Sequence, residues 1–290
     1  MLSLRIYKDK ILDYFERAKK FRAKKKFGQN FLVNGSVVES IIENANISPD
    51  DTILEIGPGL GFVTEQLAER AKKVITVEID TDAIKEIKKL PFENIEIIEN
   101  DILKTDITPL CDGSIKVVAN IPYYITSPII VHLLGELYDD EHSTRNKVTE
   151  IILMVQKEVA ERIVATNTSP SKAYGMLSVL CNFRTKTSLI QLVKARSFFP
   201  APKVDSALVK FEVQHEPMYS CKDTKMLYRV VKSCFGTRRK NIKNALKNGG
   251  FAEDKIMIAL AKANIDPLSR GESLPIQGFC DLADAFKEIL

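Results

Sequence analysis

The sequence predicts an α/β protein in which a doubly wound parallel sheet is followed by a smaller all-helical domain. From residue 52 to residue 156, short β-branched apolar runs alternate with stretches of helical periodicity, as in successive β-α-β units. A glycine-rich turn directly follows the first of these runs, where such a sheet binds its ligand. After residue 213 only helical periodicity remains. We therefore expect two domains, residues 1–213 and 214–290.

The apolar runs give the expected strands of the sheet, which are residues 52–56, 73–79, 95–100, 115–120, 149–156 and 207–213. Residues 177–193 are expected to add one or two more strands, with a polar turn at residues 185–188. The N-terminal residues 1–26 alternate apolar and charged side chains and are expected to form a basic helix.

Composition limits the class of protein. Of the 290 residues, 45% are apolar and 28% charged, which excludes collagenous, disordered and membrane-spanning classes. The N-terminus lacks the continuous apolar core of a secretory signal, so we expect a cytoplasmic protein. Five cysteines without a CxxC pair and three widely spaced histidines indicate neither a disulfide framework nor a metal site. The absence of a long apolar heptad favours a monomer.

Charge is distributed unevenly along the chain. Residues 1–30 hold 10 Lys and Arg against 3 Asp and Glu, residues 31–150 hold 10 against 22, and residues 151–290 hold 22 against 13. Two basic flanks suit a polyanionic partner such as a nucleic acid, although lysine runs are also typical of solvated surfaces. The candidate RNA-binding residues are Lys24, Lys25, Lys26, Arg238, Arg239 and Lys240.

The glycine turn EIGPGLG, residues 55–61, lies at the carboxyl end of the first expected strand. A dinucleotide fingerprint needs a third glycine where this chain has Phe62, so the spacing favours a nucleoside-type ligand. Glu78, at the end of the second strand, is placed to bind ribose hydroxyls. Asp101, after the third strand, is placed to accept a hydrogen bond from the exocyclic amine of an adenine.

The fourth strand ends in NIPYYI, residues 120–125. The side-chain oxygen of Asn120 and the backbone carbonyl of Ile121 or Pro122 are two acceptors for the N6 hydrogens of an adenine. Together they would point the poorly nucleophilic nitrogen at an electrophilic methyl group. Tyr123 would stack on the base. The alternative is an ordinary Asn-Pro turn with a buried tyrosine.

These motifs resemble those of the ribosomal RNA adenine N6-dimethyltransferases, which use S-adenosylmethionine. The matching segments are QNFL at 29–32, EIGPGLG at 55–61, VEID at 77–80, END at 99–101, NIPY at 120–123 and FFPAPKVDSALV at 198–209. Within that family, the bacterial small-subunit enzymes are the most similar, on the segments MVQKEVAERI at 154–163, SKAYGMLSV at 171–179, PKVDSA at 202–207 and FGTRRKNIKNAL at 235–246.

The resemblance implies a Rossmann-like class I methyltransferase sheet in residues 1–213 and a helical rRNA-binding domain in residues 214–290. It implies dimethylation of N6 on two adjacent adenines near the 3′ end of small-subunit (16S) rRNA during ribosome biogenesis. The cofactor residues carried over from the family are Gln29, Asn30, Leu32, Gly57, Glu78, Asp101, Ile102 and Asn120. Tyr123 and one ring of the Phe198–Phe199 pair would sandwich the flipped adenine, and which ring does so stays open.

Three other functions remain open. A large-subunit (23S) rRNA adenine methyltransferase that confers antibiotic resistance shares the catalytic motifs, but the C-terminal helices favour the small-subunit enzyme. A non-catalytic ribosome assembly factor would have lost methyl transfer, against which the intact Glu78, Asp101, Asn120 and Tyr123 argue. A DNA adenine methyltransferase is the least favoured, because it usually has two prolines where this chain has only Pro122.

Overall fold

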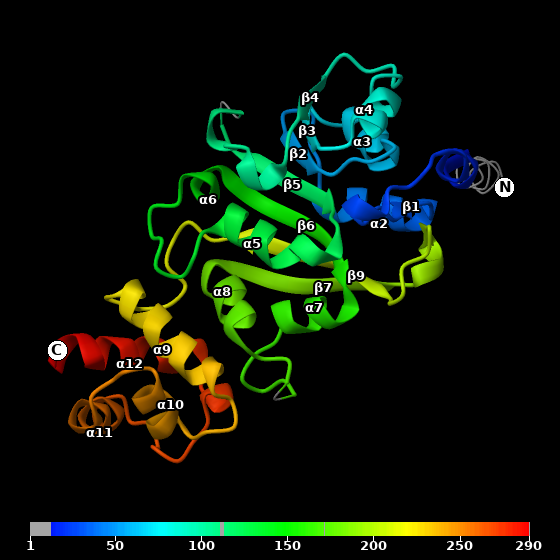
Figure 1. Ribbon diagram of the computed structural model, residues 1–290. Coiled ribbons are helices and arrows are strands. Elements are labelled where there is room, and N and C mark those ends of the chain that lie inside the picture. Colours follow the sequence, from blue (N-terminus) through cyan, green and yellow to red (C-terminus); the bar gives the residue numbers. More distant parts are fainter. Residues whose placement is uncertain (1–12, 111–112, 171, 290) are drawn as a thin grey trace. The chain divides into compact units, whose positions relative to one another are not determined.

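The computed structural model describes residues 13–110, 113–170 and 172–289 (Figure 1). The chain forms two compact units, each assembled from several segments. Unit 1 comprises Met1–Leu133, Ser143–Ala160 and Ser188–Val213. Unit 2 comprises Leu134–His142, Glu161–Thr187 and Gln214–Leu290.

A seven-stranded sheet organises unit 1, in the order β4-β3-β2-β5-β6-β9-β7. The strands are β2 Thr52–Ile56, β3 Lys73–Glu78, β4 Ile95–Glu99, β5 Ile115–Asn120, β6 Val148–Gln156, β7 Thr185–Val193 and β9 Ser206–Val213. Strands β2 to β6 pair in parallel, and β9 is antiparallel to β6. The carboxyl ends of β2, β3, β4 and β5 therefore meet at one edge of the sheet.

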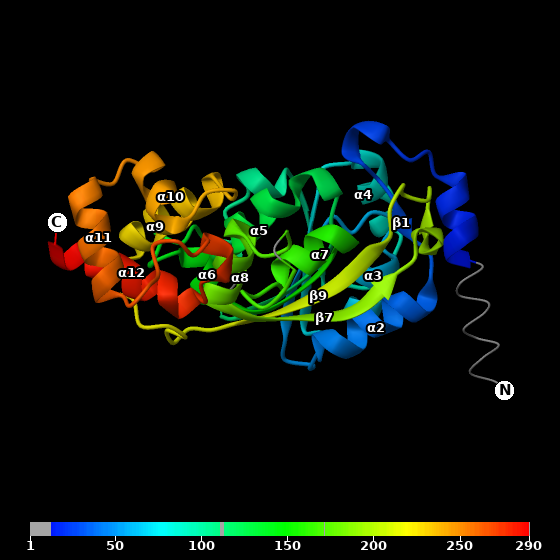
Figure 2. The ribbon, with the colours of Figure 1, turned by 90° about the horizontal axis from the view of Figure 1, so that it is seen from below.

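Helices cover both faces of this sheet, so its central strands are apolar nearly throughout. The helices are α2 Gly35–Ala45, α3 Phe62–Ala68, α4 Thr81–Ile87, α5 Thr126–Leu134, α6 Ser143–Lys147 and α7 Lys157–Ile163. Figure 2 shows α2 on one face of the sheet and α5 on the other. Helix α2 begins where the Asn34 side chain accepts a hydrogen bond from the Ser36 backbone N–H.

Short elements connect the helices and strands. They are the 3₁₀ turns η1 Lys25–Phe27, η2 Ile102–Lys104, η3 Thr108–Leu110, η4 Tyr123–Ile125 and η5 Ala195–Ser197, and the strands β1 Phe31–Leu32 and β8 Phe198–Phe199. Strands β1 and β8 form a separate two-stranded ribbon, with Phe31 opposite Phe199 and Leu32 opposite Phe198. The ribbon ties the segment before α2 to the segment before β9.

The predicted fold class is confirmed, and each of the six expected strands ends within one residue of its expected bounds. The expected turn at residues 185–188 is wrong. Residues Met176–Arg184 form helix α8, and β7 begins at Thr185. The Ser178 hydroxyl accepts the Gly175 N–H at the start of α8, and the apolar side chains of the helix, such as Val179 and Leu180, are buried.

The expected N-terminal helix is shorter than residues 1–26. Residues 1–12 lie outside the described part, residues 13–20 are helical, and η1 is a separate 3₁₀ turn. The helix does not continue because Lys24 is extended, with its backbone N–H donating to the Gln29 side chain.

Unit 2 is mainly helical. Besides α8, its elements are α9 Thr224–Gly236, α10 Ile242–Asn248, α11 Glu253–Lys262, η6 Gly271–Ser273 and α12 Ile276–Ile289. Helices α9 and α12 supply much of its core, including Leu227, Val230, Phe279 and Phe286, which are fully buried. Across residues 13–110, 113–170 and 172–289, no helix is both long and apolar enough to cross a membrane.

Candidate active site

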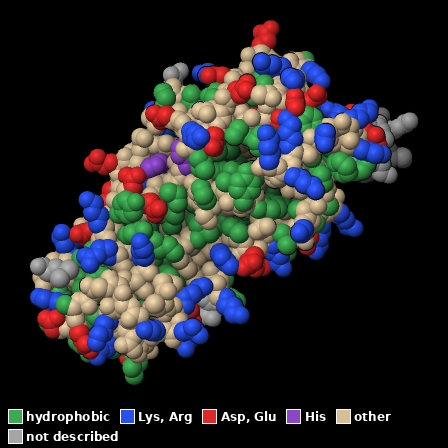
Figure 3. All heavy atoms as spheres, in the orientation of Figure 1, with side chains coloured by type: hydrophobic (Ala, Val, Ile, Leu, Met, Phe, Trp, Pro, Cys, Tyr) green, Lys and Arg blue, Asp and Glu red, His purple; other side chains and the backbone are tan. Residues whose placement is uncertain are grey.

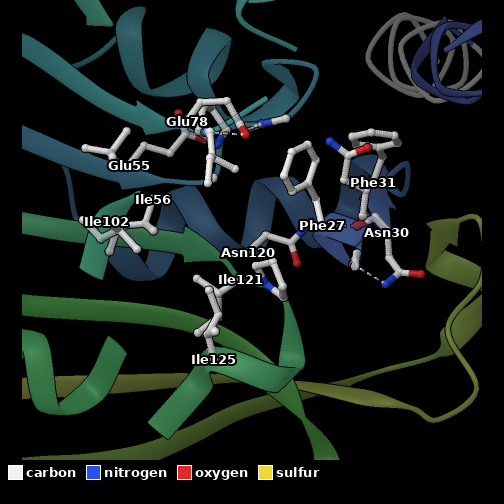
Figure 4. A pocket seen from close by; sticks show the side chains of 18 of the residues that line it. Phe27, Asn30, Phe31, Glu55, Ile56, Glu78, Ile102, Asn120, Ile121 and Ile125 are labelled. Carbon is white, nitrogen blue, oxygen red and sulfur yellow. Dashed lines mark hydrogen bonds between the residues drawn. The ribbon is translucent and has the colours of Figure 1, made fainter. Parts of the chain in front are cut away.

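A pocket in unit 1 opens at the carboxyl edge of the parallel strands (Figure 4). Its lining comes from the ends of β2, β3 and β5, the turn after β4, and the segment from Phe27 to Leu32. The predicted site residues that line it are Gln29, Asn30, Leu32, Gly57, Glu78, Asp101, Ile102, Asn120, Ile121, Pro122 and Tyr123. The topology of the sheet thus brings together side chains that are up to about ninety positions apart in the chain.

The glycine turn between β2 and α3 allows the pocket to reach the backbone. Gly57 has φ +67° and Gly59 has φ +59°, in the left-handed region that side chains disfavour. A Cβ atom on Gly59 would lie 3.1 Å from the Phe31 ring, whereas one on Gly57 would have only the Asn120 carbonyl within 4 Å, at 3.9 Å. Gly57 therefore presents open backbone to a ligand.

Three carboxylates at successive strand ends form one side of the pocket, and we call Glu55, Glu78 and Asp101 the acidic wall. Glu78 is buried and accepts backbone N–H bonds from Gly59 at 3.1 Å and from Ile79 and Asp80 at 2.9 Å each. Burial raises the pKa of the Glu78 carboxyl, and these N–H donors partly oppose that rise.

Asp101 caps the turn that follows β4. Its Oδ1 atom accepts the Leu103 backbone N–H at 3.0 Å, which fixes the carboxylate at the pocket edge. Ile102 beside it is buried and adds an apolar surface to the same corner of the pocket. A charged acceptor next to an apolar patch is suited to a planar base with an exocyclic amine.

Glu55 is a site residue to which the sequence analysis assigned no role. It is 3% exposed, and its carboxylate accepts a 2.6 Å hydrogen bond from the Thr64 hydroxyl. Burial raises the pKa of Glu55 to about 8, with a further rise from the nearby Glu78 carboxylate. The sequence contains one signal for Glu55. It is the single acid in the apolar strand TILEI, where burial of an unpaired charge is costly.

An ion-pair cluster, which we call the clasp, holds the segment before β1 against α4. The buried Asp80 carboxylate accepts hydrogen bonds from Lys24 Nζ at 2.5 Å and from Gln29 Nε2 at 2.7 Å. Lys24 Nζ also reaches Asp82 at 2.7 Å. Lys24, a predicted RNA-binding residue, is thus engaged by two carboxylates, and Gln29, which lines the pocket, is anchored by Asp80.

The other side of the pocket, which we call the neutral wall, consists of Asn120, Ile121, Pro122 and Tyr123. Asn120 Nδ2 donates to the Asn30 carbonyl at 3.3 Å, which orients the amide so that its oxygen is an available acceptor. The Tyr123 hydroxyl lies 2.5 Å from the Ser206 hydroxyl, and burial raises the pKa of Tyr123. Figure 4 shows Glu55 and Glu78 on one side of the pocket, with Asn120 and Ile121 on the other.

The two candidate stacking phenylalanines lie outside the pocket lining. Phe198 is 3% exposed and belongs to the core of unit 1. Phe199 is only partly buried and packs edge to face against Phe15, with ring centroids 5.4 Å apart. Both rings sit in β8, which pairs with the pocket-lining residues Phe31 and Leu32.

The candidate RNA-binding residues fall into two groups, one in each unit. Lys25 and Lys26 lie in η1, and Lys26 Nζ is 4.5 Å from the centre of the Phe27 ring. In unit 2, Arg238 donates to the backbone carbonyls of Tyr174 and Lys172. Arg239 and Lys240, which follow α9, are exposed. Figure 3 shows Lys and Arg side chains over the C-terminal helices.

The Rossmann-like sheet and its pocket of carboxylates and an Asn-Pro-aromatic turn define a methyltransferase. A dimethyladenosine transferase from Plasmodium falciparum has a similar structure, with a TM-score of 0.75 and 28% identity, covering 89% of this chain and 98% of that one. The 23S rRNA methyltransferase ErmE is also similar, with a TM-score of 0.65 and 26% identity, covering 89% of this chain and 100% of that one.

Sequence comparison gives the family. Residues 20–288 match the family model described as ribosomal RNA adenine dimethylase. A Ribosomal RNA small subunit methyltransferase A from Clostridium botulinum strain Langeland is 43% identical over 277 residues, which cover 93% of this chain and 96% of the relative. Its counterpart from Caldanaerobacter subterraneus is 41% identical, covering 91% and 97%. The chain belongs to the ribosomal RNA adenine dimethylase family, and it is an enzyme that dimethylates adenine in ribosomal RNA.

Proposed function

We propose that this enzyme uses S-adenosylmethionine to dimethylate N6 of two adjacent adenines near the 3′ end of small-subunit (16S) rRNA, in the cytoplasm during ribosome biogenesis. The observation that carries the proposal is that one pocket has the acidic wall on one side and the Asn120–Tyr123 turn on the other. The choice of the small subunit is supported by relatives that bear that name at 43% and 41% identity.

The acidic wall fits the cofactor. The Ile79 and Asp80 N–H groups both donate to Glu78 Oε1 and the Gly59 N–H donates to Oε2, so Oε2 retains a lone pair for a ribose hydroxyl. Asp101 uses Oδ1 for Leu103, which leaves Oδ2 for an adenine amine. The open backbone at Gly57 accommodates the methionine or ribose, and Asn30 and Leu32 close the methionine side with Gln29 nearby. The bound cofactor supplies an electrophilic methyl group.

The neutral wall orients the target adenine. The Asn120 side-chain oxygen and the carbonyl of Ile121 or Pro122 accept the two N6 hydrogens, which turns the nitrogen lone pair out of conjugation with the ring and towards the methyl group. Ile121 is 2% exposed, so its side chain is packed in the protein interior beside this turn. Tyr123 stacks on the flipped base, with its ring fixed by the Ser206 hydroxyl. Of the two phenylalanines, we assign the second stacking contact to Phe199, because Phe198 is buried in the core.

Binding of rRNA is assigned to the helical residues 214–290 and to the basic N-terminal segment. Lys25, Lys26, Arg239 and Lys240 are the groups available for phosphate. Lys24 and Arg238 are held by Asp80 and by the Tyr174 carbonyl, so they contribute to the shape of the binding surfaces and less to phosphate contact. We infer that the enzyme acts as a monomer.

The test is transfer of labelled methyl from S-adenosylmethionine to separated, unmodified small and large ribosomal subunits, followed by nucleoside analysis. We expect N6,N6-dimethyladenosine in small-subunit RNA alone. Label in large-subunit RNA would instead support the activity named for ErmE, whose structure is similar over 89% of this chain. Tight binding of subunits without label would indicate an assembly factor.

A further inference from the structure

In unit 2, the segment between β9 and α9 is tied to helix α12 by hydrogen bonds on both sides of Cys221. The Ser220 backbone N–H donates to Gln277 Oε1 at 3.3 Å, and Gln277 Nε2 donates to the Ser220 carbonyl at 3.1 Å. On the other side, the Lys222 backbone N–H donates to Asp284 Oδ1 at 2.8 Å. Cys221 is therefore held between two anchored neighbours.

The partners of that segment bracket a second cysteine on α12. Gln277, Cys280 and Asp284 are spaced by three and four positions, so they lie along one face of the helix, with Cys280 in the middle. Because its two neighbours are bonded to Gln277 and Asp284, Cys221 lies next to Cys280, and the two thiols hydrogen-bond to each other. Cys221 is partly exposed, whereas Cys280 is fully buried.

The environments of the two thiols differ. The hydrogen bond from Cys280 lowers the pKa of Cys221, and a hydrogen bond from the Asp223 backbone N–H lowers it further. Burial and the Asp284 and Asp140 carboxylates oppose this shift. The hydrogen bond to Cys221 and burial raise the pKa of Cys280. One thiol of the pair is accessible and the more readily ionised, and its neighbour stays protonated and enclosed.

We propose that Cys221 and Cys280 form a redox-sensitive dithiol, in which a hydroperoxide oxidises Cys221 and Cys280 resolves the product as an intramolecular disulfide. In the first step the Cys221 thiolate attacks the peroxide and the O–O bond breaks, giving Cys221 sulfenic acid and an alkoxide or hydroxide, which takes a proton from solvent to leave as alcohol or water. In the second step the Cys280 sulfur displaces hydroxide from that sulfenic acid, so that the S–S bond forms and water leaves. The two thiols together lose two electrons, and the peroxide gains them.

The disulfide fastens the entry to α9 onto α12 covalently. In the reduced state, hydrogen bonds of Ser220 and Lys222 and the ion pairs Lys222–Glu288 and Asp223–Lys287 hold it there. In the reducing cytosol such a bond is transient and reports oxidant exposure. The other described cysteines are unlike this pair. Cys181 and Cys234 are buried, and burial raises the pKa of both, to about 12 for Cys234.

The test treats the full-length chain with hydrogen peroxide at neutral pH, quenches with an alkylating reagent under denaturing conditions, and maps the cysteines by mass spectrometry. The chain has five cysteines, so we expect the alkylated count to fall from five to three, with Cys221 and Cys280 recovered as one linked peptide. Dithiothreitol should restore five. Sulfinic acid on Cys221 without any link, or a link between other cysteines, overturns the proposal.

Cysteine variants distinguish oxidation of the Cys221–Cys280 pair from general oxidation of thiols. C221S removes the accessible thiol, and we expect four alkylated cysteines both before and after peroxide. The control C181A removes a buried cysteine outside the pair and should still lose two thiols, from four to two. C280S places a polar side chain in the core, so C280A is tested beside it. In either variant, peroxide should leave Cys221 as a trappable sulfenic acid, because the resolving thiol is absent. Continued loss of two thiols in C221S overturns the proposal.

Discussion

The two walls of the active-site pocket are built on opposite principles. The acidic wall places a carboxylate at the end of each of three neighbouring strands, and each carboxylate is committed to at least one internal donor, such as Thr64 for Glu55. Among the described residues, the neutral wall contributes an amide, backbone carbonyls and a phenol whose pKa is raised by burial.

The acidic wall is suited to binding a ligand, and the neutral wall is suited to activating one. Buried, prearranged acceptors suit hydroxyls and an amine whose positions do not change during the reaction. The neutral wall has acceptors but, within the part that the structure describes, no carboxylate or imidazole to remove a proton from the adenine. We therefore expect it to accelerate the reaction by orientation, with the N6 proton leaving to solvent. Substitutions at Asn120, Glu78, Lys24 and Glu55 test this comparison.

The largest effect is expected for Asn120→Ala, which removes the acceptor that orients N6. We predict a fall in turnover of about 10²–10³-fold, similar to the loss of one prearranged hydrogen-bonding group in other enzymes. Cofactor binding should weaken but stay measurable, because Gly57, Glu78 and Asp101 still line the cofactor side of the pocket. Single-turnover kinetics with subunits, together with calorimetry of cofactor binding, measure the two effects.

A second substitution shows whether the acceptor is what matters. Asn120→Asp keeps an oxygen acceptor and should recover part of the lost turnover, although it loses the bond that Nδ2 donates to Asn30. Near wild-type turnover in Asn120→Ala would show that the neutral wall does not orient the base.

Glu78→Ala addresses the acidic wall. We predict a rise in the cofactor dissociation constant of about 10–100-fold, the loss expected for hydrogen bonds to a charged group. Turnover at saturating cofactor should stay within a few-fold. The matched control is Glu99→Ala, because Glu99 pairs with Glu78 in the sheet register but is exposed and outside the pocket lining. Equal effects of the two variants would contradict a specific role for Glu78.

Breaking the clasp should have an intermediate effect. Lys24→Met leaves the buried Asp80 carboxylate without its cation, and the rim segment that carries Gln29 loses its strongest tie. We predict cofactor dissociation about 3–10-fold faster, measured by stopped-flow displacement, because a solvent-screened ion pair stabilises the rim only modestly. Lys25→Met, one position along, is the control. A dissociation rate that is unchanged in Lys24→Met would contradict the clasp.

The smallest effect is expected on stability, from Glu55→Gln. The folded state keeps the Glu55 proton up to a pKa of about 8, while the unfolded state releases it near the ordinary value of 4.5. The folded state therefore binds more protons between these values, and stability is lost as pH rises from 4.5 to 8. The glutamine variant lacks this loss.

Thermal unfolding at several pH values measures the consequence of Glu55→Gln. At pH 8.5 we expect the Tm of the variant to exceed that of the wild type by about 2–4 °C or more, the shift produced by roughly 1 kcal/mol in a chain of this size. The difference should shrink towards pH 5. A Tm difference that does not depend on pH would show that Glu55 is already ionised in the folded protein.

Much of the fold was predictable because long periodic runs determine it. Strands β2 and β5 have the expected bounds, since each consists mainly of apolar residues, many of them β-branched. The turn at residues 185–188 was predicted wrongly because Thr185 and Thr187 are polar, yet Thr185 ends α8 by donating to the Cys181 carbonyl and begins an edge strand. Polar composition alone does not distinguish these structures.

The pocket lining was predictable where a motif follows a strand end, as for Glu78, Asp101 and Asn120. Residues whose place at the pocket depends on a distant partner were not predictable. From the sequence alone, Lys24 is expected to be a solvated surface cation. Its 2.5 Å contact with Asp80, fifty-six positions away in the chain, places it at the pocket rim. The two-residue ribbon of β1 and β8 is likewise too short for any periodicity to reveal.

The ribbon has a consequence for the order in which the protein matures during synthesis. Phe31 is paired with Phe199, and the Val33 N–H donates to the Ser197 carbonyl at 2.9 Å, so the N-terminal rim of the pocket is completed by residues made much later. Contacts between such distant positions form slowly, because a long loop must close first. A growing chain can assemble strands β2 to β6 while this rim is still unsecured. The pocket therefore reaches its final form only after about two thirds of the polypeptide has left the ribosome that makes it.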